Sequence, residues 1–199
     1  MKLVHKALTA MTVVLLLAGC GTAAGGHTGS GGNTGSGEKE KPKMNMQQAA
    51  ERADQILDET MAAIVPPVQW THRQTMPGNC STDRARTVMT IISEQRRSAF
   101  LGLVDRHWRS KGYAFRATSV DKLSAHYLTP DGFQLEVLIG WKGQAHFEIT
   151  TPCVDKSEVL PPTTPPNGPD YSNQPPTAPN VTSDFWSSTT PLPSSSASS

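Results

Sequence analysis

Apolar and polar residues alternate from residue 113 to residue 149, and this alternation constrains the fold more than any other feature of the chain. A period of two is typical of β-strands with one buried face, because successive side chains point to opposite sides of a sheet. Two short loops interrupt the pattern, Pro130-Asp131-Gly132 and Lys142-Gly143-Gln144. Each is typical of a three-residue hairpin turn in which Gly takes the left-handed conformation. The segment therefore predicts an antiparallel β-meander.

The two loops also predict the strand register. The first loop places Tyr127 opposite Leu135, and the second places Ile139 opposite Phe147. Both registers keep the apolar side chains on one face of the sheet, which is the condition for burying that face.

Helical spacing of apolar residues predicts two helices that can cover this face. The first follows Asn45, which is expected to cap it together with Gln48 three residues later. The second follows Ser93 and ends near Gly112. Shorter strands are expected at residues 68–72 and 87–92. The predicted fold is an α+β domain in which the meander packs on two helices, with Trp70, Trp108 and Trp141 in its core.

The two ends of the chain differ in composition from this domain. Of the 16 Gly residues, 9 lie between Gly19 and Gly37, and from Pro161 onward 25 of 39 residues are Pro, Ser or Thr. Such segments bury too little apolar surface to offset the entropy of ordering them. We therefore expect a flexible tether over residues 20–43, a globular domain over residues 44–160 and a disordered tail over residues 161–199.

The first 19 residues have the pattern of a secretory signal peptide. Lys2 and Lys6 precede an apolar stretch of about a dozen residues, which is too short to span ~30 Å of hydrocarbon comfortably. The stretch ends in Leu17-Ala18-Gly19-Cys20, which resembles the lipobox of bacterial lipoproteins. The resemblance implies cleavage before Cys20 and a diacylglyceryl thioether on its sulfur. Two acyl chains are enough for stable membrane anchoring.

Two cysteines remain once Cys20 is assigned to lipidation, and in an exported chain Cys80 and Cys153 most simply form a disulfide. The bond would close a loop of about 74 residues and stabilise the fold by on the order of 4 kcal/mol in the chain-entropy model. A redox or metal role for the pair is less favoured, because the sequence contains neither a C-x-x-C motif nor a neighbouring His-Cys spacing.

Charge and motifs exclude several classes of function. There are 18 Lys and Arg against 17 Asp and Glu, a net charge of +1, without the basic footprint of a nucleic-acid binder. The nucleophile elbow, the Walker loop, the dinucleotide fingerprint and the H-E-x-x-H metalloprotease motif are missing from the sequence. We expect no enzymatic activity, no cofactor and no nucleic-acid partner.

One arrangement of polar residues on the outward face of the meander suggests a less favoured alternative. The predicted register places His126 opposite Glu136 and Glu136 opposite Thr150, with His146 and Glu148 on the last strand. His126, Glu136 and His146 would then be the candidate ligands of a metal-dependent enzyme. Polar side chains are, however, what any solvated face of an antiparallel sheet displays.

The order of these features resembles the small actinobacterial lipoproteins of the LppA type. The shared features are a lipobox Cys, a helix ending in residues 61–66, an aromatic strand at residues 68–70, a loop Cys at 80, a final hairpin ending at Cys153 and a Pro-rich exit at residues 159–162. The resemblance covers roughly residues 17–165. It implies a surface lipoprotein and supplies no activity, catalytic residues or ligand.

These observations lead to one expected function and one main alternative. The chain is expected to be a non-enzymatic envelope lipoprotein, anchored through Cys20 in the outer leaflet of the cell membrane and facing the cell wall. Its domain would bind an envelope protein or a cell-wall component. The alternative is a carrier of a small ligand or lipid, with an apolar cavity between the helices and the sheet.

Overall fold

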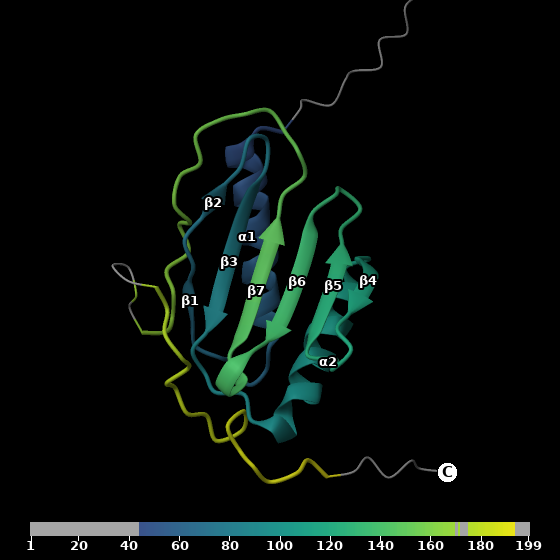
Figure 1. Ribbon diagram of the computed structural model, residues 1–199, viewed down its shortest axis with the longest axis vertical. Helices are drawn as coiled ribbons and strands as arrows, with labels where there is room; N and C mark the ends of the chain where they lie inside the picture. The colour runs from purple at the N-terminus through teal and green to yellow at the C-terminus, as the bar shows by residue number, and fades with distance from the viewer. Residues whose placement is uncertain (1–43, 170, 172–174, 194–199) are drawn as a thin grey trace, which may run out of the picture. The chain divides into compact units, whose positions relative to one another are not determined.

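The computed structural model describes residues 44–169, 171 and 175–193. The expected signal peptide at residues 1–19 and the tether at residues 20–43 lie outside this range. The described residues form two helices and a seven-stranded antiparallel sheet (Figure 1). The predicted α+β class, with an antiparallel meander packed on two helices, is confirmed.

Helix α1 spans Met46–Ala63 and helix α2 spans Glu94–Ser110. The predicted cap of α1 is confirmed, because the Asn45 side chain accepts from the Gln48 N–H and the Gln48 side chain accepts from the Asn45 N–H. Ser93 is the N-cap residue of α2, but its side chain makes no capping hydrogen bond, and its hydroxyl donates to the carbonyl of Ser188 instead. In the part of the chain that the structure describes, helices long and apolar enough to cross a membrane are absent.

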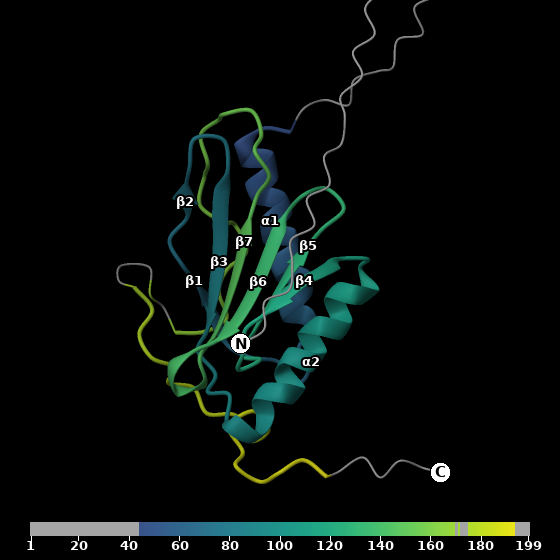
Figure 2. The same cartoon turned by 45° about the vertical axis from the view of Figure 1, so that its right-hand side comes forward.

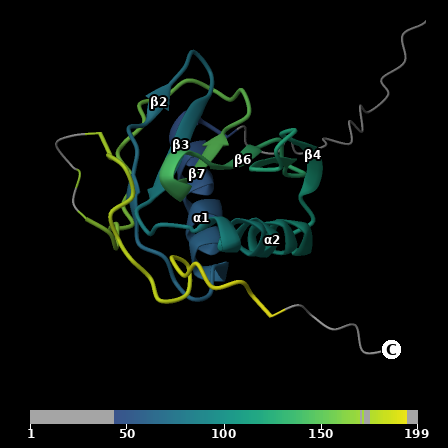
Figure 3. The same ribbon diagram turned by 60° about the horizontal axis from the view of Figure 1, so that its bottom comes forward.

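The sheet has the strand order β1-β3-β7-β6-β5-β4, and β2 pairs with β3 beside β1. Its strands are β1 (Trp70–His72), β2 (Met76–Pro77), β3 (Thr82–Val88), β4 (Ala114–Thr118), β5 (Ser124–Leu128), β6 (Gln134–Ile139) and β7 (Ala145–Thr150). Both helices lie on the same side of the sheet, as Figures 1 and 3 show. On the opposite side, which we call the outer face, neither of the described helices lies against the sheet.

The predicted register is right for one hairpin and wrong for the other. Tyr127 lies opposite Leu135, as the Pro-Asp-Gly loop predicts. Ile139 lies opposite Ala145 rather than Phe147. The turn still has three residues but lies one position earlier in the chain, because the short 3₁₀ helix η1 (Trp141–Gly143) forms it and the Gly140 N–H donates to the Gln144 carbonyl. Moving the turn by one position changes the partner of Ile139 by two residues. A shift of two residues leaves every side chain on its predicted face.

The core lies between the helices and the inner face of the sheet. Trp108 of α2 packs edge-on against Tyr127 and Phe147, and its Nε1 donates to the Thr60 hydroxyl of α1 at 2.9 Å. Trp70 and Trp108 are buried, as predicted. Edge-to-face contacts between aromatic rings stabilise the fold beyond the effect of their buried area, and they fix the position of the helices on the sheet.

Two buried arginines distinguish β3 from the other strands. Arg84 and Arg86 point to the inner face and form ion pairs with Asp54 at 3.1 Å and Asp58 at 2.6 Å, both on α1. The Arg86 guanidinium also lies 3.8 Å from the centre of the Trp70 ring. The strand expected at residues 87–92 is therefore observed at residues 82–88. The alternation pattern requires apolar residues at inward positions, and it missed the start of this strand because those positions carry charge.

The tail beyond residue 160 follows the edge of strand β1. The Trp70 N–H donates to the Asn167 side chain at 2.9 Å, the Gly168 N–H donates to the Trp70 carbonyl at 3.0 Å, and the Asn167 amide donates to the Val68 carbonyl. His72 is bonded to the Thr164 carbonyl at 2.8 Å. Backbone groups that an edge strand would leave unpaired are thus satisfied by the chain itself.

The tail then returns to the core, and the prediction of a disordered tail over residues 161–199 is wrong for the residues that the structure describes. Trp186 is 0% exposed and packs edge-on against Phe100 of α2. Figures 1 and 2 show this segment, in yellow, passing beneath the sheet and the start of α2. The domain boundary at residue 160 is therefore also wrong. Composition averaged over the tail does not reveal the buried side chain of Trp186 or the hydrogen bonds that hold this segment on the domain.

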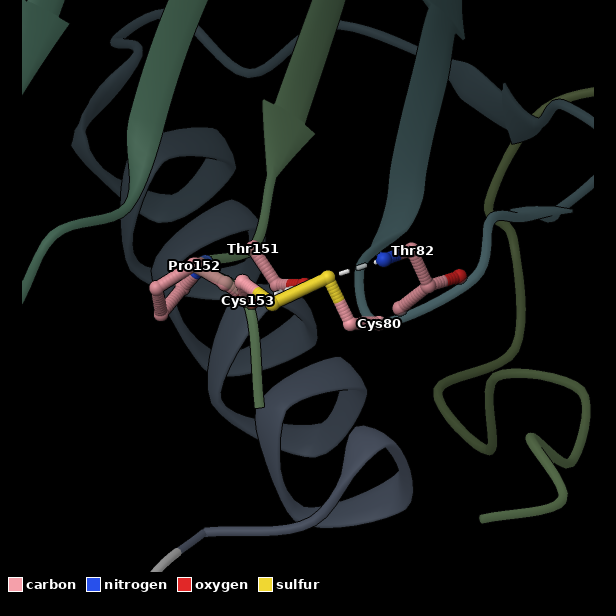
Figure 4. The surroundings of a disulfide bond; sticks show 5 residues. All are labelled: Cys80, Thr82, Thr151, Pro152 and Cys153. Carbon is pink, nitrogen blue, oxygen red and sulfur yellow. Dashed lines mark hydrogen bonds between the residues drawn. A yellow bond between two sulfur atoms is a disulfide. The ribbon is translucent and has the colours of Figure 1, made fainter. Parts of the chain in front are cut away.

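The predicted disulfide joins Cys80, in the loop before β3, to Cys153, just after β7 (Figure 4). Their Cα atoms are 4.8 Å apart. Next to the bond, the Thr82 N–H donates to the Thr151 hydroxyl at 3.0 Å. The disulfide and this hydrogen bond hold β3 and β7 together at one end of the sheet.

Candidate functional site

The outer face of the sheet is hollowed in two adjoining places. One hollow, of about 420 Å³, lies between Arg73, Leu138 and His146 of the sheet region and Pro175 and Pro176 of the tail. The other, of about 350 Å³, is lined by Arg116, His126, Gln134 and Thr150, among others. Both hollows are also lined by Glu136 and Glu148, and we call the two together the outer-face groove. Their volumes lie in the range of small-ligand sites.

A row of ionisable side chains crosses the groove from one side of the sheet to the other. Glu148 of β7 lies opposite Glu136 of β6, and Glu136 lies opposite His126 of β5. Arg73, just after β1, reaches Glu148 with 3.2 Å between Nη1 and Oε2. Ala85 of β3, a buried residue with a small side chain, lies between these two residues: it is opposite Glu148, and its carbonyl accepts from the Arg73 N–H.

His146 lies in the first hollow and is half-buried. Its Nδ1 is 3.2 Å from the Thr87 hydroxyl, which lies opposite it on β3. Burial lowers the pKa of His146 below its ordinary value of 6.5, and the nearby Arg73 lowers it further. The ring is therefore neutral at pH 7, and the groove carries its charge on Arg73, Arg116 and the two glutamates.

The tail builds one wall of the groove. Pro175 and Pro176 line the first hollow, and the next residue, Thr177, accepts a hydrogen bond through its carbonyl from Gln144 Nε2 at 2.7 Å. Gln144 belongs to the turn between β6 and β7 and is itself buried. The two prolines are thus held next to the sheet by a residue of the same hairpin that carries Leu138.

The geometry does not assemble a metal centre from the residues that were candidates for one. His126 Nε2 and Glu136 Oε1 are 3.9 Å apart, and His146 lies opposite Leu138 rather than beside either of them. Across the described ranges, groups of three or more His, Cys, Asp or Glu side chains able to hold a metal ion are absent.

Trp141 is an exposed aromatic residue at the turn between β6 and β7. Its expected place in the core is wrong, because 72% of the residue is exposed and the Lys142 ammonium lies 4.3 Å from its ring centre. The turn is held from beneath, where the Ile92 N–H donates to the Gly143 carbonyl at 3.0 Å. A Cβ on Gly143 would lie 1.9 Å from the Ile92 carbonyl oxygen, so only Gly fits there.

Alternation along the strands predicted part of this site. The pairing of His126 with Glu136 is confirmed, whereas Glu136 lies opposite Glu148 and not Thr150. Sequence reasoning missed Arg73, Pro175 and Pro176, because they come from segments whose position depends on tertiary contacts. The outward side chains of the hairpins are the only sequence signal that marked this face.

The expected lipidation residue Cys20 and its lipobox, Leu17, Ala18 and Gly19, lie outside the described residues. Comparison of the chain with protein-family models, curated proteins and solved structures gives no match. The likeness to the LppA-type lipoproteins therefore stays an expectation from the sequence.

Proposed function

We propose that this protein is a lipid-anchored envelope lipoprotein whose domain binds a partner in the outer-face groove and catalyses no reaction. In this proposal Cys20 carries the anchor in the outer leaflet of the cell membrane. Residues 20–43 form the tether, and the domain faces the cell wall. The partner is an envelope protein or a cell-wall component.

The anchor is supported by the sequence around Cys20 and by the disulfide. The basic residues, the apolar stretch and Leu17-Ala18-Gly19-Cys20 occur in the order that export and lipidation require. The disulfide between Cys80 and Cys153 suits an exported protein, because such bonds persist in oxidising compartments and are rare in the cytosol.

The outer-face groove is the observation that supports binding. Both helices cover the inner face, and the tail covers the β1 edge and closes the core, while the groove stays open. Its polar side chains already pair with one another, Arg73 with Glu148 and Thr87 with His146. Ligand sites are usually largely formed before the ligand binds, so a prearranged surface of this kind supports a binding role.

The carrier alternative would require a cavity between the helices and the sheet. Phe100, Trp108 and Phe147 meet there with ring centres about 6 Å apart and are at most 1% exposed. We therefore propose the outer face, and not the space beneath the helices, as the place where a ligand binds.

Site-directed photo-crosslinking in intact cells tests this proposal. A photoreactive residue replaces Leu138, in the groove, or Arg106, which is exposed on α2 on the other side of the sheet. We expect a discrete crosslinked product from position 138 that is absent from position 106. Identical patterns at the two positions, or no product at position 138, would refute the groove as the binding site.

A further inference from the structure

The tail, yellow in Figures 1 and 2, pairs with the main chain of residues 89–93 as an added strand would. The Val181 N–H donates to the Met89 carbonyl at 2.9 Å, and the Ile91 N–H donates to the Val181 carbonyl at 2.9 Å. Further along, the Ser93 N–H donates to a tail carbonyl at 2.9 Å. Alternate residues of this segment thus turn backbone groups towards the tail, as the edge of a sheet does towards an incoming strand.

The side chain of Trp186 is buried next to this segment. Its ring centre lies 5.3 Å from that of Phe100 on α2, and its indole Nε1 donates to the Pro66 carbonyl at 2.6 Å. When a protein binds an extended peptide by strand addition, main-chain hydrogen bonds give affinity and an enclosed side chain gives specificity. The tail therefore contacts the domain in the way that a bound peptide contacts its receptor.

Arg96 is a buried charged side chain that points into the same place. Only 5% of the residue is exposed, its Nε donates to the Phe185 carbonyl at 3.0 Å, and its Nη1 donates to the Thr190 carbonyl at 2.7 Å. A buried charge needs hydrogen-bond partners, and the tail supplies them through backbone carbonyls. We call the residues that hold the tail here the acceptor site: 89–93, Arg96, Phe100 and Pro66.

The tail reaches the acceptor site through a short stretch of chain. Gly168 is bonded to Trp70 at the β1 edge, and Thr177 accepts from the Gln144 side chain. Thr177 follows Gly168 by nine positions, and a stretch of that length spans at most about 30 Å, the diameter of a small domain. The part of the tail beyond this stretch is thus long enough to reach the acceptor site of an adjacent copy.

We propose that two copies of this protein exchange residues 175–193 reciprocally, so that the acceptor site of each copy holds Trp186 of the other. The exchange keeps every contact that the tail makes with a domain, because each copy gives one tail and receives one. Pro175 and Pro176 move with the tail, so each copy also supplies one wall of the other copy's outer-face groove. This inference goes beyond the proposed function and does not depend on the lipid anchor or on a ligand in the groove.

A segment of a different protein is a less suitable occupant of the acceptor site. It would have to displace a tail that is covalently attached, and therefore present at an effective concentration on the order of millimolar. With a second copy, the exchanged and unexchanged forms contain the same contacts, and their ratio depends on the protein concentration relative to that effective concentration. Reciprocal exchange about a two-fold axis also closes the assembly at two copies.

Photo-crosslinking of isotopically mixed protein tests the exchange. A photoreactive residue replaces Thr189, which is exposed and precedes Thr190, in unlabelled full-length protein. This protein is mixed with an equal amount of ¹⁵N-labelled full-length protein, unfolded in urea with the disulfide intact and refolded in detergent micelles. Mass spectrometry distinguishes the two kinds of product, because only a crosslink between copies joins an unlabelled tail peptide to a labelled peptide. Protein with the photoreactive residue at Arg106, which is exposed on α2, is the matched control.

We expect position 189 to form crosslinks to labelled peptides from the first turns of α2, which contain Arg96, and position 106 to form none between copies. Refolding at one tenth of the protein concentration should lower the ratio of between-copy to within-copy product by about tenfold while the monomer predominates, because the dimer forms by mass action. Trp186→Ala in the photoreactive copy should abolish the between-copy product, since the exchanged tail loses its buried side chain.

Crosslinks confined to unlabelled peptides when the concentration of labelled protein is highest would overturn the exchange, as would equal between-copy yields from positions 189 and 106. Both comparisons use the natural Trp186, so they decide the question even if Trp186→Ala fails to fold. The crosslink from position 138 to a partner is measured separately, so failure of the exchange is distinguishable from failure of the proposed function.

Discussion

The indole Nε1 of Trp186 donates a hydrogen bond to the carbonyl oxygen of Pro66 at 2.6 Å, across 120 residues of sequence. This bond joins the Pro-rich tail to the loop that follows α1. Around it, the Ser93 N–H donates to the Trp186 carbonyl at 2.9 Å, and Arg96 Nε donates to the Phe185 carbonyl at 3.0 Å. The tail is thus an integral part of the domain and contributes its last large core side chain.

Replacing Trp186 by alanine should destabilise the domain by about 3–5 kcal/mol, because the substitution leaves a cavity in the core and removes the hydrogen bond to Pro66. Urea unfolding followed by circular dichroism measures the change. Trp141→Ala is the matched control, since Trp141 is mostly exposed, and we expect a change within about 0.5 kcal/mol. Equal effects of the two substitutions would contradict the packing of the tail.

Arg84→Met should cost about 3–5 kcal/mol, because it leaves the Asp54 carboxylate buried without its partner. Burial already raises the pKa of Asp54 above its ordinary value, so the carboxylate depends on nearby positive charge to stay ionised. The comparison is Arg73→Met, which removes a partly exposed ion pair and should cost no more than about 1 kcal/mol. A double variant that also replaces Asp54 by leucine should recover part of the loss. If it is less stable than Arg84→Met alone, the pair does not act as described.

The stability of the domain should fall as the pH drops from 7.5 to 5. Burial lowers the pKa of His72, His107 and His146 below the ordinary 6.5. Below pH 6.5 the unfolded chain therefore binds more protons at these histidines than the folded chain does. The contribution of the neutral histidines to the free energy of unfolding is complete above pH 6.5 and is lost as the pH falls below that value. Urea midpoints measured across this range test the direction. The variant with all three histidines replaced by glutamine should show a smaller decline, and an equal decline would rule these groups out as the cause.

Local signals in the sequence predicted the helices and the meander, because caps and alternation act over a few residues. The β5–β6 register followed from Pro130-Asp131-Gly132 alone. The β6–β7 register did not, since Lys142 and Gly143 both take positive φ and the turn is fixed by contact with Ile92, a residue 51 positions before Gly143.

The charged strand β3 and the tail were missed for a related reason. Arg84 and Arg86 occupy inward positions of β3 that pattern reasoning reserves for apolar residues, and they are tolerated because Asp54 and Asp58 of α1 face them. Trp186 is one aromatic residue in a segment whose composition predicts disorder. In both cases a partner distant in sequence decides the structure, and a local pattern does not contain that partner.

The mass of the N-terminal peptide of the protein, isolated from membranes, tests the lipid-anchored account most directly. We predict a peptide that begins at Cys20 and carries a diacylglyceryl group on its sulfur. Cys20→Ala should abolish the modification and release the protein from the membrane fraction. An unmodified peptide, or a mature chain that begins at another residue, would contradict the anchor on which the proposed function rests.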